Sequence, residues 1–222
     1  MRDWFVMYKW SLAFLLSINL AACAADSPPP AITSDDGGKP VILVVGDSLS
    51  AGYGIEIRQT WVSLLQQRLN MQGHDYDVVN ASVSGDTTSG GLTRLKTALP
   101  KHNPVLVVLE LGGNDGLRAL PLPVIESNLN TMIELSRDAG AAVALLGMRI
   151  PTNYGPRYTQ KFHALYQEAA KRHELPLVDF FMDGVALDAN LMQADGVHPN
   201  AAAQPKLLDN AWPAIEQALL AR

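Results

Sequence analysis

From residue 41 onward, short runs of aliphatic residues alternate with longer segments in which apolar residues recur every three or four positions. The aliphatic runs predict β-strands, at residues 41–45, 76–80, 105–111, 143–146 and 177–180. The longer segments predict amphipathic helices, at residues 61–70, 88–99, 123–138, 158–174 and 201–220. Strands that are apolar on both faces are typical of a parallel sheet covered by helices on either side.

This alternation predicts an α/β fold of three layers, α/β/α, with a five-stranded parallel sheet. Right-handed crossovers leave few topologies for such a sheet, and we favour the flavodoxin-like strand order 2-1-3-4-5. In that order the first strand lies between the second and the third, at the point where open α/β sheets bind ligands. We expect one domain, at residues 40–222, without an internal repeat.

The first 39 residues have a different composition. Arg2 and Lys9 precede an apolar stretch at residues 10–20, and small residues follow it. This pattern is typical of a secretory signal peptide, predicted at residues 1–22. The apolar stretch is too short to span a bilayer comfortably. Residues 23–39, with three consecutive prolines and a Gly-Gly pair, predict a flexible tether.

Cys23 is the one cysteine of the chain, so an intrachain disulfide is excluded. It ends the run Leu-Ala-Ala-Cys, which resembles the bacterial lipoprotein box, where the chain is cut before the cysteine and the cysteine is lipidated. The alternative is cleavage by the ordinary signal peptidase after Ala24. We therefore expect an exported, periplasmic protein, with membrane attachment through Cys23 in the first case and none in the second.

The charge of the chain argues against one class of partner. The net charge is −5 over 222 residues. Without residues 1–22 the chain has 15 basic and 21 acidic residues, hence −6. A nucleic-acid-binding protein would present a basic face. The chain also lacks Cys-x-x-Cys pairs and His-Glu-x-x-His, so we expect no metal and no cofactor.

Polar residues follow the first predicted strand at the edge where a ligand site is expected. Gly46, Asp47 and Ser48 end this strand, and Ser48 is our candidate nucleophile. A serine hydroxyl is a weak nucleophile unless a base lies within hydrogen-bond reach. Histidine suits that role, and His198 follows the fifth strand, so it can meet Ser48 at the same edge. Asp195, three residues earlier in a tight loop, can orient the imidazole.

A serine nucleophile also requires hydrogen-bond donors for the oxyanion of the tetrahedral intermediate. The candidates are the side-chain amide of Asn114, after the third strand, and the backbone N–H groups of Gly85 and Ser48. Each residue has a simpler interpretation as a helix cap, a turn residue or surface polarity. Four such stretches at one sheet edge favour a catalytic site.

These stretches resemble the four sequence blocks of the GDSL, or SGNH, hydrolase family. The blocks are Gly-Asp-Ser-Leu-Ser at residues 46–50, Gly85, Gly-Asn-Asp at 113–115 and Asp-Gly-Val-His-Pro at 195–199. The likeness extends from residue 40 to the C-terminus and is closer still to the bacterial thioesterase I / lysophospholipase / arylesterase branch. The resemblance implies the flavodoxin-like fold, a triad of Ser48, His198 and Asp195, and oxyanion donors from Ser48, Gly85 and Asn114.

The expected activity is hydrolysis of acyl esters, among them aryl esters, thioesters and lysophospholipids, through an acyl-enzyme. We expect the loop at residues 116–123 to line an acyl groove, and a packed connection is the alternative. Four residues are candidate substrate contacts, the last from a stretch that resembles the same branch: Leu117, Leu120, Leu122 and Tyr154. Alternative functions are a carbohydrate-ester deacetylase of the same fold and a non-catalytic acyl-chain binding protein. We expect a monomer.

Overall fold

The computed structural model describes residues 38–221. The predicted signal peptide at residues 1–22, the candidate lipidation site Cys23 and nearly all of the predicted tether therefore lie outside the described residues.

The described residues contain a five-stranded parallel sheet in the order β2-β1-β3-β4-β5, which confirms the predicted topology. The strands are β1 (Val41–Gly46), β2 (Asp77–Asn80), β3 (Leu106–Glu110), β4 (Ala142–Leu146) and β5 (Leu177–Val178). β3 pairs over its full length with residues 42–46 of β1, and the pairing ends with Gly46 opposite Glu110. The loops that follow these two strands therefore start side by side.

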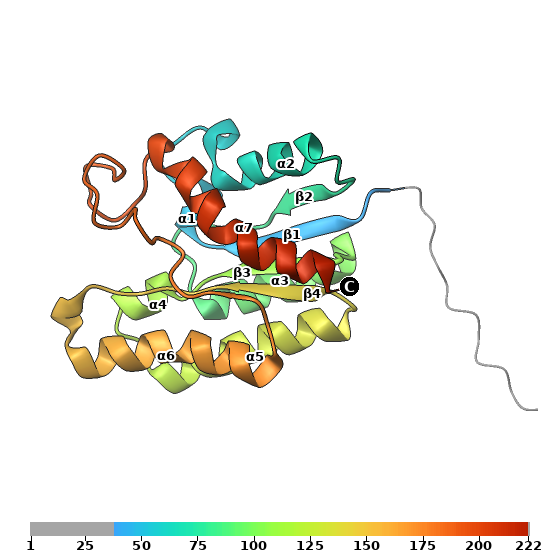
Figure 1. The fold of residues 1–222 in the computed structure, drawn as a ribbon. Helices are drawn as coiled ribbons and strands as arrows, with labels where there is room; N and C mark the ends of the chain where they lie inside the picture. Colours follow the sequence, from blue (N-terminus) through green and yellow to red (C-terminus); the bar gives the residue numbers. More distant parts are fainter. Residues whose placement is uncertain (1–37, 222) are drawn as a thin grey trace, which may run out of the picture. The chain divides into compact units, whose positions relative to one another are not determined.

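Helices cover both faces of the sheet, as the alternating pattern predicted (Figure 1). One face is covered by α2 (Trp61–Met71) and α7 (Gln204–Leu220). The other face is covered by α3 (Thr88–His102), α5 (Leu122–Asp138) and α6 (Pro156–His173). The predicted helices agree with these bounds to within a few residues.

Several short elements were not predicted, because four or five residues are too few to show a helical period. Two of them follow the central strands, namely α1 (Ser48–Ala51) after β1 and α4 (Gly113–Leu117) after β3. Three single turns of 3-10 helix complete the fold: η1 (Ile57–Gln59), η2 (Thr152–Tyr154) and η3 (Ala201–Ala203).

Two predicted boundaries were wrong. α3 continues through Pro100, where we expected it to end, because Asn103 adopts a left-handed φ of 42° and its N–H closes the last turn on Leu99. β5 is two residues shorter than predicted. Gly147, the residue after β4, donates its N–H to Val178 O and accepts the N–H of Phe181 at its own carbonyl. The pairing therefore skips the two residues between Val178 and Phe181.

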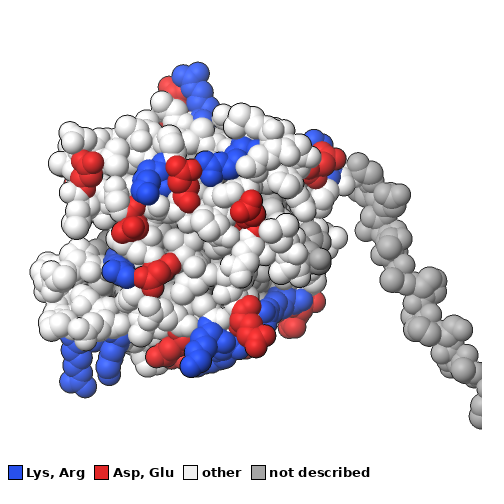
Figure 2. Space-filling model, viewed as in Figure 1, with Lys and Arg blue, Asp and Glu red and all other residues white. Residues whose placement is uncertain are grey.

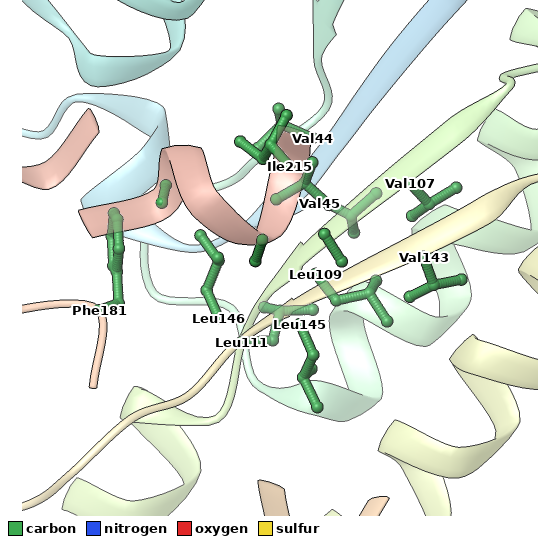
Figure 3. Close-up of a cluster of buried hydrophobic side chains, with 14 of the residues drawn as sticks. Val44, Val45, Val107, Leu109, Leu111, Val143, Leu145, Leu146, Phe181 and Ile215 are labelled. Carbon is green, nitrogen blue, oxygen red and sulfur yellow. The ribbon is translucent and has the colours of Figure 1, made fainter. Parts of the chain in front are cut away.

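The hydrophobic core lies on both sides of the two central strands. Ile42, Leu43, Val44 and Val45 of β1 are all fully buried, as are the side chains of β3. Figure 3 shows side chains of β1, β3 and β4 packed together with Ile215 of α7. Burial on both faces explains why these strands are apolar except for Glu110 at the end of β3. It also gives the ends of β1 and β3 a rigid support.

A truncation in the centre of this core should be costly. Leu109 on β3 is fully buried, and we expect Leu109→Ala to lower the free energy of unfolding by about 2–5 kcal/mol. The matched control is Leu187→Ala, at a fully exposed position, which should change it by less than about 0.5 kcal/mol. Urea denaturation at neutral pH measures both. Equal effects of the two substitutions would contradict this description of the core.

Candidate active site

A sharp turn at the end of β1 presents Ser48. Asp47 is the N-cap of α1, and its Oδ1 accepts a hydrogen bond from Leu49 N at 3.0 Å. Ser48 is thus the first residue of the short helix. Gly46 has no room for a side chain, because a Cβ would lie 2.6 Å from Glu110 Oε2. A glycine here lets the turn approach β3 closely.

Ser48, His198 and Asp195 form a continuous hydrogen-bonded chain. Ser48 Oγ lies 3.0 Å from His198 Nε2, and His198 Nδ1 lies 2.7 Å from Asp195 Oδ2. An aspartate on Nδ1 favours the tautomer that carries its proton there, which leaves Nε2 free to accept the serine proton. The structure therefore brings together the three residues that the sequence analysis proposed as a triad.

Asp195 is held as a carboxylate by its own loop. Its Oδ1 accepts the backbone N–H groups of Val197 at 2.9 Å and His198 at 3.0 Å. These bonds and the bond to the imidazole lower the pKa of Asp195 to about 2. Gly196 allows the tight turn, with a φ of +67°. Hydrogen bonds to the charged form account for the lowered pKa, because the carboxylate itself is solvent-exposed.

Two residues that the sequence analysis did not identify hold the histidine in place. The ring of Tyr53 lies against the imidazole of His198, with 4.4 Å between the ring centroids. The side-chain Nε2 of Gln193 donates to Tyr53 O at 2.7 Å and to Pro199 O at 3.0 Å. The backbone N–H of Gln193 donates to His198 O at 2.7 Å. The one local signal was position, since Tyr53 follows the nucleophile turn and Gln193 precedes Asp195 by two residues.

Asn114 lies on α4, directly beside the nucleophile turn. Its Nδ2 donates to Asp47 Oδ2 at 3.0 Å and to Asp86 O at 2.9 Å. One helical turn later, Arg118 donates to Gly85 O at 3.1 Å. α4 is therefore tied to two consecutive carbonyl groups of the loop after β2. The role of Arg118 was not predicted, although its spacing of four from Asn114 is a detectable signal.

Two backbone N–H groups at this edge lack protein acceptors. Within residues 38–221, no hydrogen bond uses the backbone N–H of Ser48 or of Gly85. Gly85 has a φ of +83°, which other residues rarely adopt. The Asn114 amide differs, because both of its N–H groups already have acceptors. An oxyanion would have to share or replace one of those contacts.

Two buried carboxyl groups lie behind the turn. Asp47 is 2% exposed and Glu110 is fully buried. Burial raises the pKa of Asp47 to about 6, against the opposing effect of the hydrogen bonds from Leu49 and Asn114. Burial, with the negative charge of Asp47, raises the pKa of Glu110 well above its usual range. The site thus combines an exposed, strongly acidic Asp195 with two buried, weakly acidic groups.

The structure separates the four candidate substrate contacts. Leu122, the first residue of α5, and Tyr154 in η2 line a cavity of about 390 Å³ together with the first turns of α6. Leu117 is partly exposed on α4 but does not line this cavity. Leu120 does not line this cavity and packs against the core, as Leu122 and Tyr154 also do, so its contact with substrate stays a prediction. The loop is also shorter than expected because α4 and α5 occupy its ends.

Tyrosine hydroxyls hold this connection in position. Tyr154 donates to Leu117 O at 2.7 Å, and Tyr158 donates to Leu120 O at 2.9 Å.

Within residues 38–221 there is no cluster of His, Cys, Asp or Glu suited to a metal ion. None of the helices in this range is both long and apolar enough to cross a membrane.

The fold and the site define a serine hydrolase with a Ser-His-Asp arrangement at the C-terminal edge of a parallel sheet. Residues 44–204 match the GDSL-like Lipase/Acylhydrolase family, and the chain belongs to this family. The predicted family is thus confirmed.

Similar proteins agree with this assignment. The chain is 51% identical to esterase TesA of Pseudomonas aeruginosa over 178 residues, covering 80% of this chain and 89% of that protein. It is 40% identical to thioesterase 1/protease 1/lysophospholipase L1 of Escherichia coli K12 over 205 residues, covering 91% of this chain and 90% of the relative. A structure of the psychrotrophic esterase EstA from Pseudoalteromonas sp., inhibited by monoethylphosphonate, superposes with a TM-score of 0.77 at 39% identity, covering 82% of this chain and 99% of the other.

The two aspartates of the site should titrate far apart. We expect carbon-detected NMR to give a pKa of about 6 for Asp47 and about 2 for Asp195. Because the pKa of Asp47 is raised on folding, its ionisation lowers the free energy of unfolding as pH rises from about 4 toward and through 6. Asp195 acts in the opposite sense, and its contribution is lost only as pH falls from about 4 to about 2.

The variant Asp47→Asn is the control for this titration, since it should remove the Asp47 resonance and the part of the slope of stability between pH 4 and 6 that Asp47 contributes, whereas Glu110, whose pKa is also raised, keeps its own part. An Asp47 carboxyl that titrates near the ordinary aspartate value would contradict the buried environment described above.

Proposed function

We propose that this protein is a serine esterase that hydrolyses acyl esters and thioesters, with Ser48 as nucleophile, His198 as general base and Asp195 as the residue that orients the base. The observation that carries the proposal is the unbroken hydrogen-bonded chain from Ser48 Oγ through the imidazole to Asp195. An exported position, by way of the predicted signal peptide, belongs to the same proposal.

In the first half of the reaction, Ser48 Oγ attacks the acyl carbonyl carbon while its proton passes to His198 Nε2. The resulting imidazolium is stabilised by the carboxylate of Asp195. The oxyanion binds the N–H groups of Ser48 and Gly85, which have no acceptor among the described residues. The intermediate collapses when the C–O or C–S bond breaks, and the leaving alcohol or thiol takes the proton from His198.

In the second half, a water molecule attacks the acyl-enzyme. His198 accepts the proton of the water, and the same N–H groups stabilise the second tetrahedral intermediate. Collapse releases the carboxylic acid, and the proton returns to Ser48 Oγ. Asn114 supplies the third oxyanion donor by sharing the N–H that now bonds to Asp86 O or to Asp47 Oδ2.

The surroundings of the site support an apolar acyl group as the substrate. Leu122 and Tyr154 line the cavity between the starts of α5 and α6. Figure 2 shows acidic and basic side chains interspersed on the face that it draws, without a large patch of one sign. The apolar part of the cavity lining favours medium or long acyl chains over the polar ring of a carbohydrate.

Ser48 should be the one residue that an activated phosphonate modifies. We expect a fluorophosphonate probe to add a single adduct to the native protein, and none to Ser48→Ala, because Ser48 is the one serine of residues 38–221 that has an imidazole within hydrogen-bond distance. Intact-protein mass spectrometry measures the adduct. The matched control, Ser82→Ala, should be labelled like the native protein. Absence of labelling in the native protein would favour the non-catalytic acyl-binding alternative.

The same spectrum tests the fate of the N-terminus. A mass increase by a lipid on a chain that begins at Cys23 would support membrane attachment. A chain that begins at Ala25 without added mass would support release after ordinary cleavage, and a chain that still carries residues 1–22 would contradict export.

Loss of the Asn114 amide should slow the chemical step rather than weaken binding. We expect Asn114→Ala to lower kcat by about 10²–10³-fold, the usual effect of removing one oxyanion donor. Kinetics with aryl esters of acetate and octanoate measure this effect. The native enzyme should prefer the octanoate, and a preference for acetylated sugars would favour the deacetylase alternative. As a control, Asn130→Ala on α5 should leave kcat unchanged, and an unchanged kcat in Asn114→Ala would remove the proposed role.

A further inference from the structure

Glu110 is a buried carboxylic acid that the reaction described above does not use. It is the last residue of β3, directly opposite Gly46 in the parallel pairing, and it is fully buried. Its Oε2 accepts the hydroxyl of Ser50 at 2.6 Å and the backbone N–H of Asp47 at 3.4 Å. The carboxyl group thus contacts both ends of the turn that presents Ser48.

The environment of Glu110 is unfavourable for a charge. Its Oε1 has no hydrogen-bond partner among residues 38–221, and no ion pair of this part of the chain includes it. The charge of Asp47 opposes ionisation of Glu110, and the phenol of Tyr166 also interacts with Glu110. Arg94, whose Nη1 lies 3.5 Å from Gly46 O, forms its ion pair with Asp86 and not with Glu110. A buried carboxyl without a counter-ion loses its charge by binding a proton. The neutral acid is therefore the form that this site favours.

The turn is also connected to the loop that carries His198. Ser50 Oγ accepts the indole N–H of Trp61 at 3.2 Å. The backbone N–H of Trp61 donates to Gln204 Oε1 at 2.9 Å, and Gln204 Nε2 donates to Asn200 O at 3.2 Å. Asn200 lies two residues after His198. A hydrogen-bonded path, buried except for its last bond, therefore runs from β3 through α1, α2 and α7 to the histidine loop.

We propose that Glu110 is a positioning residue for the hydrolysis: as an uncharged acid, it holds the turn at residues 47–50 so that Ser48 Oγ stays within reach of His198 Nε2. The proposal rests on the serine esterase function proposed above. An apolar residue of similar volume would fill the same space but would leave Asp47 N–H and Ser50 without this acceptor. The acceptor, rather than the negative charge, is the property that the turn requires.

Two substitutions separate these properties. Glu110→Gln keeps the size and an acceptor oxygen without an ionisable group, and we expect its kcat to stay within about threefold of native, with an unchanged pH profile from pH 6 to 9. Glu110→Met removes the acceptor and should lower kcat on the order of 10- to 100-fold. KM should change by less than about twofold, because a misplaced nucleophile slows the chemical step without altering substrate binding. Stopped-flow and steady-state assays with an aryl ester measure both.

Two further variants distinguish positioning from general loss of stability. Val108→Ala on the same strand is also fully buried, and it should lower the unfolding temperature while leaving kcat at 25 °C unchanged. Ser50→Ala removes the hydroxyl through which Glu110 acts and should lower kcat as well. The effects of Ser50→Ala and Glu110→Met on kcat should be less than additive, because both substitutions remove the same hydrogen bond between Ser50 and Glu110.

The outcomes separate the two proposals. If the native enzyme turns over and is labelled, and Glu110→Met is fully active, the positioning role alone is overturned. If the native enzyme does not turn over, the esterase function is overturned. A Glu110→Gln variant as slow as Glu110→Met would also overturn the positioning role, since it would assign the effect to the charge. If Glu110→Met does not fold, Glu110→Gln and Ser50→Ala decide, and a native kcat in Ser50→Ala overturns the proposal.

Discussion

The parallel pairing of β1 with β3 is the constraint on which the rest of the site depends. The last pair in this register, Gly46 opposite Glu110, determines that the turn after β1 and the helix after β3 begin side by side. Ser48 and Asn114 are consequently neighbours although 66 positions separate them in the sequence. The pairing itself is stabilised by burial of both faces of the two strands, so the geometry of the site draws on the most rigid part of the fold.

The three carboxyl groups around Ser48 differ in burial and in hydrogen-bond partners, and these surroundings give each a different role. Asp195 lies at the surface and stays ionised because backbone and imidazole N–H groups bond to it. Asp47 is buried, and its oxygens orient Leu49 N and the Asn114 amide. Glu110 lies deeper and accepts from the turn itself. Buried polar groups of this kind reduce stability unless they are hydrogen-bonded, and they are found where function requires a defined geometry.

The oxyanion side of the site is tied together by α4. Asn114 and Arg118 lie one helical turn apart, and they bond to the carbonyl groups of Asp86 and Gly85, respectively. The helix therefore places its own amide and, at the same time, the loop that carries the Gly85 N–H. The positions of these groups are therefore set before the substrate binds, although an oxyanion would have to share or replace one of the two acceptors of the Asn114 amide.

The sequence by itself determined the fold class, the strand order and the identity of the triad residues that the structure brings together. Aliphatic runs long enough to show a pattern, such as residues 41–45, predict buried strands, and parallel strands bring the residues after them to one edge. Contacts between distant residues required the tertiary structure. The local signals for Tyr53, Gln193 and Arg118 were position and spacing, which do not say what these residues contact. The burial of Glu110 has no such signal.

The same reason accounts for the errors. α1 and α4 are too short to show a period. For the apolar loop residue Leu120 the sequence left two positions open, a groove lining and a packed connection, and its surroundings at α5 and Tyr158 belong to the tertiary structure. A pattern along the chain therefore determines which residues are buried or lie at the sheet edge, whereas the packing of elements in three dimensions determines which of them touch.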